Sequence, residues 1–241
     1  MPYNTIMITE RQKAILFTVV NEYVKGAEPV SSQQLYESHD FGVSPATLRS
    51  EFAALDEEGY LSQPHTSAGR VPTDKGYRLF VDALLGQRER DEKRMKDLLH
   101  RLVRFQAEGN ALFAQMARMI ASLSGSAVFS GPMGSRAFFK SGIHEVLNQP
   151  ELEDASQRKR FGDVVDSFDE KFGVFSGALE EEGPSVFIGK ENPLAPARDF
   201  SMMISKYRLP DDEGVVVIFG PKRMDYRRNL RLLDALEDFF D

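Results

Sequence analysis

Apolar residues recur every three or four positions through the first part of the chain, which is the spacing of a helix with one buried face. The first such stretch follows Thr9, which forms a capping-box pattern with Gln12, and Gly26 is expected to end it. A second capping-box pattern, Ser31 with Gln34, is expected to open a short helix. The buried face of the first helix is expected to contain Ile15, Leu16, Val19, Val20 and Tyr23.

A third helix is predicted from Ser44, an N-cap residue, with Pro45 at the first helical position. Its buried side is expected to carry Leu48, Phe52 and Leu55. At about 100° per residue, the opposite side and its flanks carry Ala46, Thr47, Arg49, Ser50, Ala53 and Glu57. The N-terminal half of this helix is therefore small, polar and cationic, and it lacks the bulk that would keep it out of a DNA groove. In a helix-turn-helix, the N-terminal residues of the second helix contact base edges.

A short hairpin is predicted directly after Gly59, which is expected to end the third helix. Tyr60–Gln63 is predicted as one strand, Pro64–Gly69 as the turn and Arg70–Val71 as the start of the return strand. The tip of this wing is expected to present side chains that can bond phosphate or enter a minor groove, namely His65, Thr66, Ser67 and Arg70. Thr73 is then expected to cap a fourth helix.

Three short capped helices alone would equally fit a small helical domain that binds nothing, but a wing after the third helix favours DNA binding. Lys75, in the fourth helix, could lie near the DNA backbone. The residues expected to contact DNA are therefore Ala46, Thr47, Arg49, Ser50, His65, Thr66, Ser67, Arg70 and Lys75.

The rest of the chain is predicted to be helical over residues 84–124 and mixed afterwards. The stretch after residue 84 mixes Arg and Lys with Glu and Asp, which is typical of a solvated helix face, although it could also help to hold DNA. Strands covered by helices indicate a sensor-type domain and, for the whole chain, an α+β fold. The predicted elements are strands at Ala127–Ser130, Ala137–Lys140, Ser185–Ile188, Met202–Arg208 and Val215–Phe219, with helices at Gln157–Phe172 and Tyr226–Phe240.

Charge and composition narrow the possible functions. The net charge is −7, and residues 1–82 carry 7 Lys and Arg against 11 Asp and Glu, so DNA binding would depend on the local placement of cations. The chain has no Cys, its four His are not spaced as metal ligands, and it has no phosphate-cradling glycine motif. We therefore expect no enzyme, no cofactor and no metal. No signal peptide or membrane-spanning run is found, which favours a cytoplasmic protein.

Residues 8–82 resemble the N-terminal domain of the HrcA family of bacterial heat-inducible transcription repressors. The matching phrases are TERQKAIL, GAEPVSSQQL and VSPATLRSEFAALDEEGYLSQPHTSAGRVPTDKGYRLFVD. The second half resembles the family's GAF-like domain through KSGIHEVLNQPEL, IGKENP, SKYRL and GPKRMDYRRNLRLLDAL. The chain departs from the family in having Ser50 where Asn is usual, Ser31 where Gly is usual, and only a short join before KSGIHEVLNQPEL, where members usually carry a long segment.

The resemblance implies a winged helix DNA-binding domain over residues 1–82 and a helical connector over 83–107. It implies a reduced GAF-like domain over 108–241 that lacks most of the family's inserted dimerisation region. The function implied is repression of heat-shock chaperone genes by a homodimer at the inverted repeat called CIRCE in double-stranded DNA, under control of the GroE chaperonin. The alternative is a protein-interaction or small-ligand sensor module with weak non-specific DNA binding, which the acidic first domain, Ser50 and the short middle favour.

Overall fold

The computed structural model describes residues 8–65, 68–86, 109–134, 138–176, 179, 183–209 and 213–240. The chain divides into two compact units, residues 1–87 and 88–241, and each unit buries its own apolar side chains. The expectations for residues 87–108, which make up most of the predicted connector, lie outside the described residues. Among the described helices, none has the length and apolar character needed to cross a bilayer.

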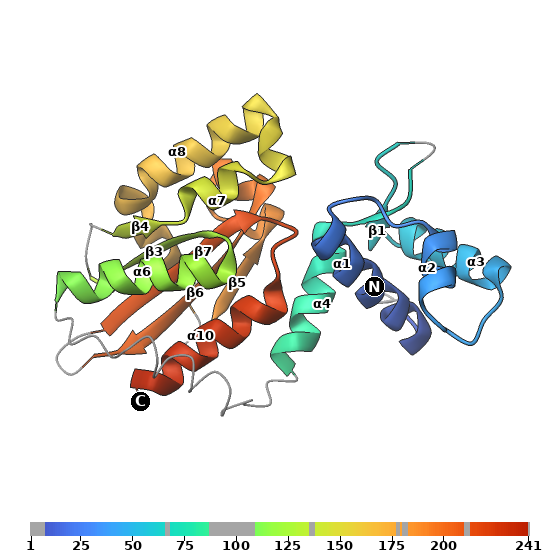
Figure 1. The fold of residues 1–241 in the computed structure, drawn as a ribbon, viewed down its shortest axis with the longest axis horizontal. Coiled ribbons are helices and arrows are strands. Elements are labelled where there is room, and N and C mark those ends of the chain that lie inside the picture. The colour runs from blue at the N-terminus through green and yellow to red at the C-terminus, as the bar shows by residue number, and fades with distance from the viewer. Residues whose placement is uncertain are drawn as a thin grey trace, which may run out of the picture. The chain divides into compact units, whose positions relative to one another are not determined.

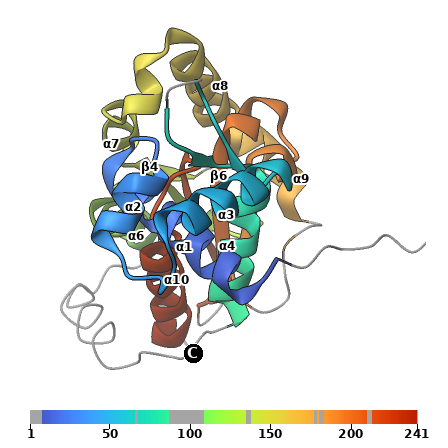
Figure 2. The same ribbon diagram turned by 90° about the vertical axis from the view of Figure 1, so that its right-hand side faces the viewer.

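Within its described residues, the N-terminal unit contains four helices and a small two-stranded sheet (Figure 2). The helices are α1 (Glu10–Gly26), α2 (Ser32–Ser38), α3 (Pro45–Glu57) and α4 (Asp74–Gly86), and the strands are β1 (Leu61–Ser62) and β2 (Val71–Pro72). Its apolar core draws on every one of the four helices and on β1. The buried apolar residues are Ile15, Leu16, Val19, Val20, Val30, Leu35, Leu48, Phe52, Leu55, Leu61, Tyr77, Phe80 and Val81.

The helix ends explain why these helices begin and stop where they do. Thr9 forms the predicted capping box with Gln12, and Ser31 Oγ accepts the amide of Gln34 at 3.0 Å. Among the described residues, that bond at Ser31 lacks the reciprocal half, so the second predicted box is a simple N-cap. The predicted stop at Gly26 is one residue early, because α1 includes Gly26 and Ala27 takes the left-handed conformation at φ 56°. The predicted burial of Tyr23 is partial.

The described residues of the C-terminal unit form one antiparallel sheet of five strands in the order β4-β3-β7-β6-β5. The strands are β3 (Ala127–Pro132), β4 (Phe139–Ser141), β5 (Ser185–Ile188), β6 (Phe200–Arg208) and β7 (Glu213–Pro221). The longest pairing joins β6 and β7 from Phe200 opposite Pro221 to Arg208 opposite Glu213. The strands predicted from the sequence are all present within the described residues, although the first residue of the predicted Ala137–Lys140 strand lies outside them.

Helices cover both faces of this sheet (Figure 1). One face lies under α6 (Asn110–Ser124) and α10 (Tyr226–Phe240), and the other lies under α7 (Ile143–Leu147), α8 (Ala155–Lys171) and α9 (Gly173–Ser176). Helices packed on an antiparallel sheet make the fold α+β. Short 3-10 helices at Pro150–Glu153, Gly189–Glu191 and Ala195–Asp199 join the elements.

The two faces of the sheet differ in what they bury. Under α8 the core is aromatic: the rings of Phe161 and Phe219 stack at 5.4 Å, and those of Phe129 and Phe168 lie 4.3 Å apart. Under α6 and α10 the sheet presents hydroxylated residues among aliphatic ones, and the Tyr207 hydroxyl lies 3.3 Å from Ser130 Oγ. Burial raises the pKa of Tyr207 to about 12, although the Ser130 bond opposes the shift.

Polar residues in the turns of this unit cap helices and form an ion pair between loops. Asp154 caps α8 by accepting the amides of Ser156 and Gln157. Hydrogen bonding by the Ser156 side chain, followed by these two amide bonds, lowers the pKa of the Asp154 carboxyl group. Asp225 accepts the amide of Arg228 at 3.0 Å and opens α10. Arg223 binds Glu151, with Nε 2.6 Å from Oε1. The GPKRMDY segment therefore forms a turn after β7 and the entry to α10.

Candidate nucleic-acid interface

The N-terminal half of α3 is exposed, as the hydrophobic pattern predicts. Ala46, Arg49 and Ser50 are exposed, whereas Thr47 is half-buried. Ser44 Oγ accepts the amide of Thr47 at 3.2 Å, and the Thr47 hydroxyl lies 2.9 Å from the same oxygen. Within the described part of the chain Arg49 has no ion-pair partner, so its guanidinium is available to a ligand. The predicted exposure of the N-terminal half of α3 is therefore confirmed, and its contact with DNA stays a prediction.

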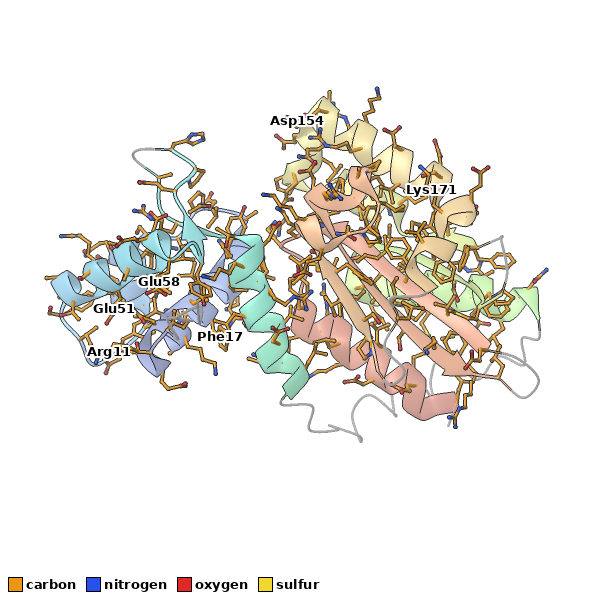
Figure 3. All side chains as sticks on the ribbon, turned by 180° about the vertical axis from the view of Figure 1, so that it is seen from behind. Arg11, Phe17, Glu51, Glu58, Asp154 and Lys171 are labelled. Carbon is orange, nitrogen blue, oxygen red and sulfur yellow. The ribbon has the colours of Figure 1, made fainter. Side chains whose placement is uncertain are left out.

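The opposite side of α3 fixes that surface on the rest of the unit. Leu48 and Leu55 are fully buried and Phe52 is nearly so. Glu51 lies beside α1, with its Oε1 3.7 Å from Nη1 of Arg11 (Figure 3). Because α3 is anchored by its apolar side and by this ion pair, its exposed residues are held in one orientation.

The C-terminal end of α3 leads directly into the wing through a Schellman motif. Gly59 has φ 75°, its amide donates to Asp56 O, and the amide of Tyr60 donates to Leu55 O, each at 2.9 Å. Only glycine takes this conformation without strain, so the chain reverses at Gly59 and enters β1. The sequence prediction that Gly59 ends the helix is confirmed.

The wing is shorter than predicted. Leu61 pairs with Pro72 and Ser62 with Val71, so the two strands share two residue pairs. At the tip the amide of Ala68 donates to His65 O at 2.9 Å, and Gln63 Nε2 donates to Ala68 O at 2.9 Å. His65 is exposed at this tip, whereas Thr66 and Ser67 lie outside the described residues. Contacts of these three residues with DNA stay predictions.

Arg70 does not lie at the tip, and that part of the prediction is wrong. It forms an isolated bridge with Val30: the Val30 amide donates to Arg70 O at 2.9 Å, and the Arg70 amide donates to Val30 O at 2.8 Å. Its Nε lies 2.7 Å from Oδ2 of Asp56, and its side chain is 21% exposed. Neither Val30 nor Asp56 can be recognised as a partner from the sequence, because the contacts are long-range.

Lys75 is placed at the far end of α3. Its Nζ donates to the carbonyl of Glu58 at 2.8 Å and lies 3.9 Å from the centre of the Tyr60 ring. Thr73 caps α4 as predicted, because its Oγ1 accepts the amide of Gly76 at 3.2 Å and donates to Gly59 O at 2.6 Å. The charge of Lys75 therefore offsets the negative end of the α3 dipole.

Charge is arranged along α3 even though the unit is acidic overall. The exposed N-terminal half carries Arg49 and the positive end of the helix dipole. The acidic residues Asp56, Glu57 and Glu58 are at the other end, where Arg70 and Lys75 contact two of these three residues. The start of α3 therefore attracts anions more strongly than its acidic end does.

These features define the class of the N-terminal unit: it is a winged helix-turn-helix, with α2 and α3 as the helix pair and β1 and β2 as the wing. The chain belongs to the HrcA family, since the model of the HrcA protein C terminal domain matches residues 79–230. The chain is also similar to the protein named heat-inducible transcription repressor HrcA of Natranaerobius thermophilus, with 27% identity over 92% of this chain and 93% of that protein.

Other similarities are more local or concern the fold alone. The protein of the same name from Nocardioides sp. is 63% identical over 78 residues, which are 32% of this chain and 23% of the relative. A crystal structure described as that of a hypothetical protein has a TM-score of 0.80 at 21% identity and covers 97% of this chain and 99% of that one. It shows that a solved protein has the same fold.

The full-length comparison also reveals a difference in length. The alignment with the Natranaerobius protein runs over 323 positions, whereas 92% of the 241 residues here is about 222 residues. About a hundred aligned positions therefore carry no residue of this chain. In the described fold, β3 and β4 are direct antiparallel neighbours, with Val128 opposite Ser141.

Proposed function

We propose that this protein is a DNA-binding transcription repressor whose α3 enters the major groove of double-stranded DNA. The observation that carries the proposal is the exposed, small and cationic N-terminal half of α3, held by a buried opposite side and followed by a wing. Ala46, Arg49 and Ser50 leave room for a base edge, and Arg49 has the two parallel donors that guanine O6 and N7 accept. The names of the relatives, heat-inducible transcription repressors, support the same role.

The operator is proposed to be an inverted repeat of the CIRCE type in front of heat-shock chaperone genes. A homodimer would place one α3 in each half-site, since a two-fold symmetric protein matches a two-fold symmetric sequence. Thr47, Ser50, His65, Thr66 and Ser67 would add contacts to bases or phosphates. Repression would be steric, and the GroE chaperonin is proposed as the partner that keeps the repressor active in the cytoplasm.

The proposed domains are a winged helix domain over residues 1–82, a connector over 83–107 and a reduced GAF-like domain over 108–241. The direct pairing of β3 with β4 supports a deletion between these two strands, where the family's inserted dimerisation region would begin. The dimer contact would then come from the remaining chain. Light scattering on the purified protein tests this: a dimer is expected, and a strict monomer with and without operator DNA would refute the dimer.

DNA binding is tested by titrating the full chain against a labelled CIRCE duplex and a scrambled duplex of equal length. Specific complexes should be tighter than non-specific ones by about three orders of magnitude or more at physiological salt. Weak binding to both duplexes that falls uniformly with salt would instead support the alternative, a sensor or protein-interaction module with non-specific DNA affinity.

A further inference from the structure

The wing needs more support than its own two residue pairs supply. Leu61 with Pro72 and Ser62 with Val71 form the whole ladder, and a hairpin of this length is not stable by itself in water. Its position relative to α3 must therefore come from contacts at its base. Arg70, the residue directly before β2, makes such contacts with two other segments of the unit.

The backbone of Arg70 ties the wing to the segment between α1 and α2. Both hydrogen bonds of the Val30 bridge have ordinary lengths, 2.8 and 2.9 Å, and Val30 itself is 2% exposed. The neighbouring Gly69 lies so close to the Val30 backbone that any Cβ would overlap it. The base of the wing is thus fixed in place, while the side chain of Arg70 is directed to α3.

The side chain of Arg70 reaches Asp56, which lies on the same side of α3 as Arg49. The two α3 residues are seven positions apart, which is about 20° around the helix and about 10 Å along its axis. Arg70 Nε and Asp56 Oδ2 are 2.7 Å apart, and Asp56 is 32% exposed in its side chain. The ion pair therefore connects the wing to the row of α3 residues that would face DNA.

We propose that Arg70 and Asp56 form a clamp that sets the position of the wing relative to the reading surface of α3, so that Arg70 is a positioning residue. The clamp also neutralises a carboxylate that would otherwise repel phosphates on the same side of α3. This inference rests on the proposed function for its consequence in DNA binding. The geometry of the clamp itself belongs to the free protein and can be tested without DNA.

The first experiment measures the wing position directly. The chain has no Cys, so Ala53→Cys on α3 and His65→Cys on the wing give two unique spin-label sites, both exposed. The distance distribution between the labels should be narrow in the parent and broad in Asp56→Ala and Arg70→Ala. The charge-swapped pair Asp56→Arg with Arg70→Asp should narrow it again. Asp82→Ala, which removes a carboxylate paired with Arg78 at 3.3 Å on α4, is the matched control and should change nothing.

The second experiment is a double-mutant cycle with operator DNA. Asp56→Ala and Arg70→Ala should each weaken specific binding by about tenfold, and the double variant should lose no more than either single variant. The slope of affinity against salt should stay that of the parent, because no phosphate contact is removed. Thermal unfolding of each variant separates loss of the clamp from loss of the fold, and Arg70→Lys, which keeps the charge, should retain part of the affinity.

The outcomes separate the clamp from the proposed function. Unchanged label distances in Asp56→Ala would overturn the clamp, whatever the DNA data are. A loss in Arg70→Ala with a reduced salt slope, and no loss in Asp56→Ala, would show that Arg70 contacts a phosphate directly. If the parent binds no DNA specifically but the distances broaden as stated, the clamp stands and the repressor proposal fails.

Discussion

Arg49 and Asp56 lie seven residues apart on one side of α3, and of the two only Asp56 has an ion-pair partner among the described residues. Asp56 is paired with Arg70 at 2.7 Å, whereas Arg49 is exposed and has no ion pair among the described residues. The same helix side thus presents a cation without a partner near its start and a neutralised carboxylate near its end. This arrangement favours an anionic ligand at the start of α3 despite the excess of acidic residues in the unit.

Replacing Arg49 should reduce sequence recognition. Arg49→Ala is expected to weaken binding to the inverted repeat by about 1–3 kcal/mol, because a bidentate contact to guanine is lost. Arg49→Lys keeps the positive charge but loses the two parallel N–H donors of the guanidinium group. This variant should bind scrambled DNA like the parent but lose most of the preference for the operator. Fluorescence anisotropy on both duplexes measures this, and equal losses on both would identify a phosphate contact instead.

Gly76 should not tolerate a side chain, because α4 passes very close to the backbone of Tyr60. A Cβ at Gly76 would collide with the Tyr60 carbonyl oxygen, whereas nothing lies within 4 Å of a Cβ at Gly86 in the same helix. Gly76→Ala is therefore expected to destabilise the protein by about 1–3 kcal/mol. Gly86→Ala is the matched control and should be neutral or slightly stabilising. Urea unfolding followed by circular dichroism measures both changes.

Thr73 should matter through its hydroxyl group, which serves two elements at once. Thr73→Ala removes the N-cap of α4 and the 2.6 Å bond to Gly59 O, and should lower the unfolding free energy by about 1 kcal/mol or more. Thr73→Ser retains both bonds and should stay within a few tenths of a kcal/mol of the parent. Equal stability of the Ala and Ser variants would contradict the role assigned to the hydroxyl.

Tyr207 should make stability depend on alkaline pH. Burial raises its pKa from 10 to about 12, so the native state favours the neutral phenol. The resulting stabilisation is complete below pH 10 and is lost as the pH rises through 12, at most about 3 kcal/mol. Tyr207→Phe cannot ionise and should show a smaller fall over this window. Chemical unfolding at pH 9, 10 and 11 compares the two proteins, and identical pH profiles would exclude this contribution.

Structural features that depend on neighbouring residues could be predicted from the sequence. Thr9, Ser44 and Gly59 form hydrogen bonds with residues a few positions away, so the helix starts and the helix end that they define can be predicted from the sequence. The buried side of α3 can also be predicted, because the helix period alone places Leu48, Phe52 and Leu55 on one side. The exposure of Ala46, Arg49 and Ser50 follows from the same period.

Partners that come from distant segments could not be predicted in this way. Arg70 was expected at the wing tip because the sequence shows only its place after Gly69. In the structure its backbone pairs with Val30 and its side chain with Asp56, so it lies at the base of the wing. Lys75 likewise reaches the end of α3 across seventeen residues. Such contacts depend on how helices pack, and no local pattern records that packing.

The amino-acid sequence by itself determined the capped helices, the place of the wing along the chain, the strands of the second unit and the family resemblance, because each rests on local periodicity or on continuous motifs. The tertiary structure decided the order of the five strands, the Arg70–Asp56 ion pair and the placement of Lys75. These features join residues that are far apart in the chain, and only the close packing of the core brings such residues within bonding distance.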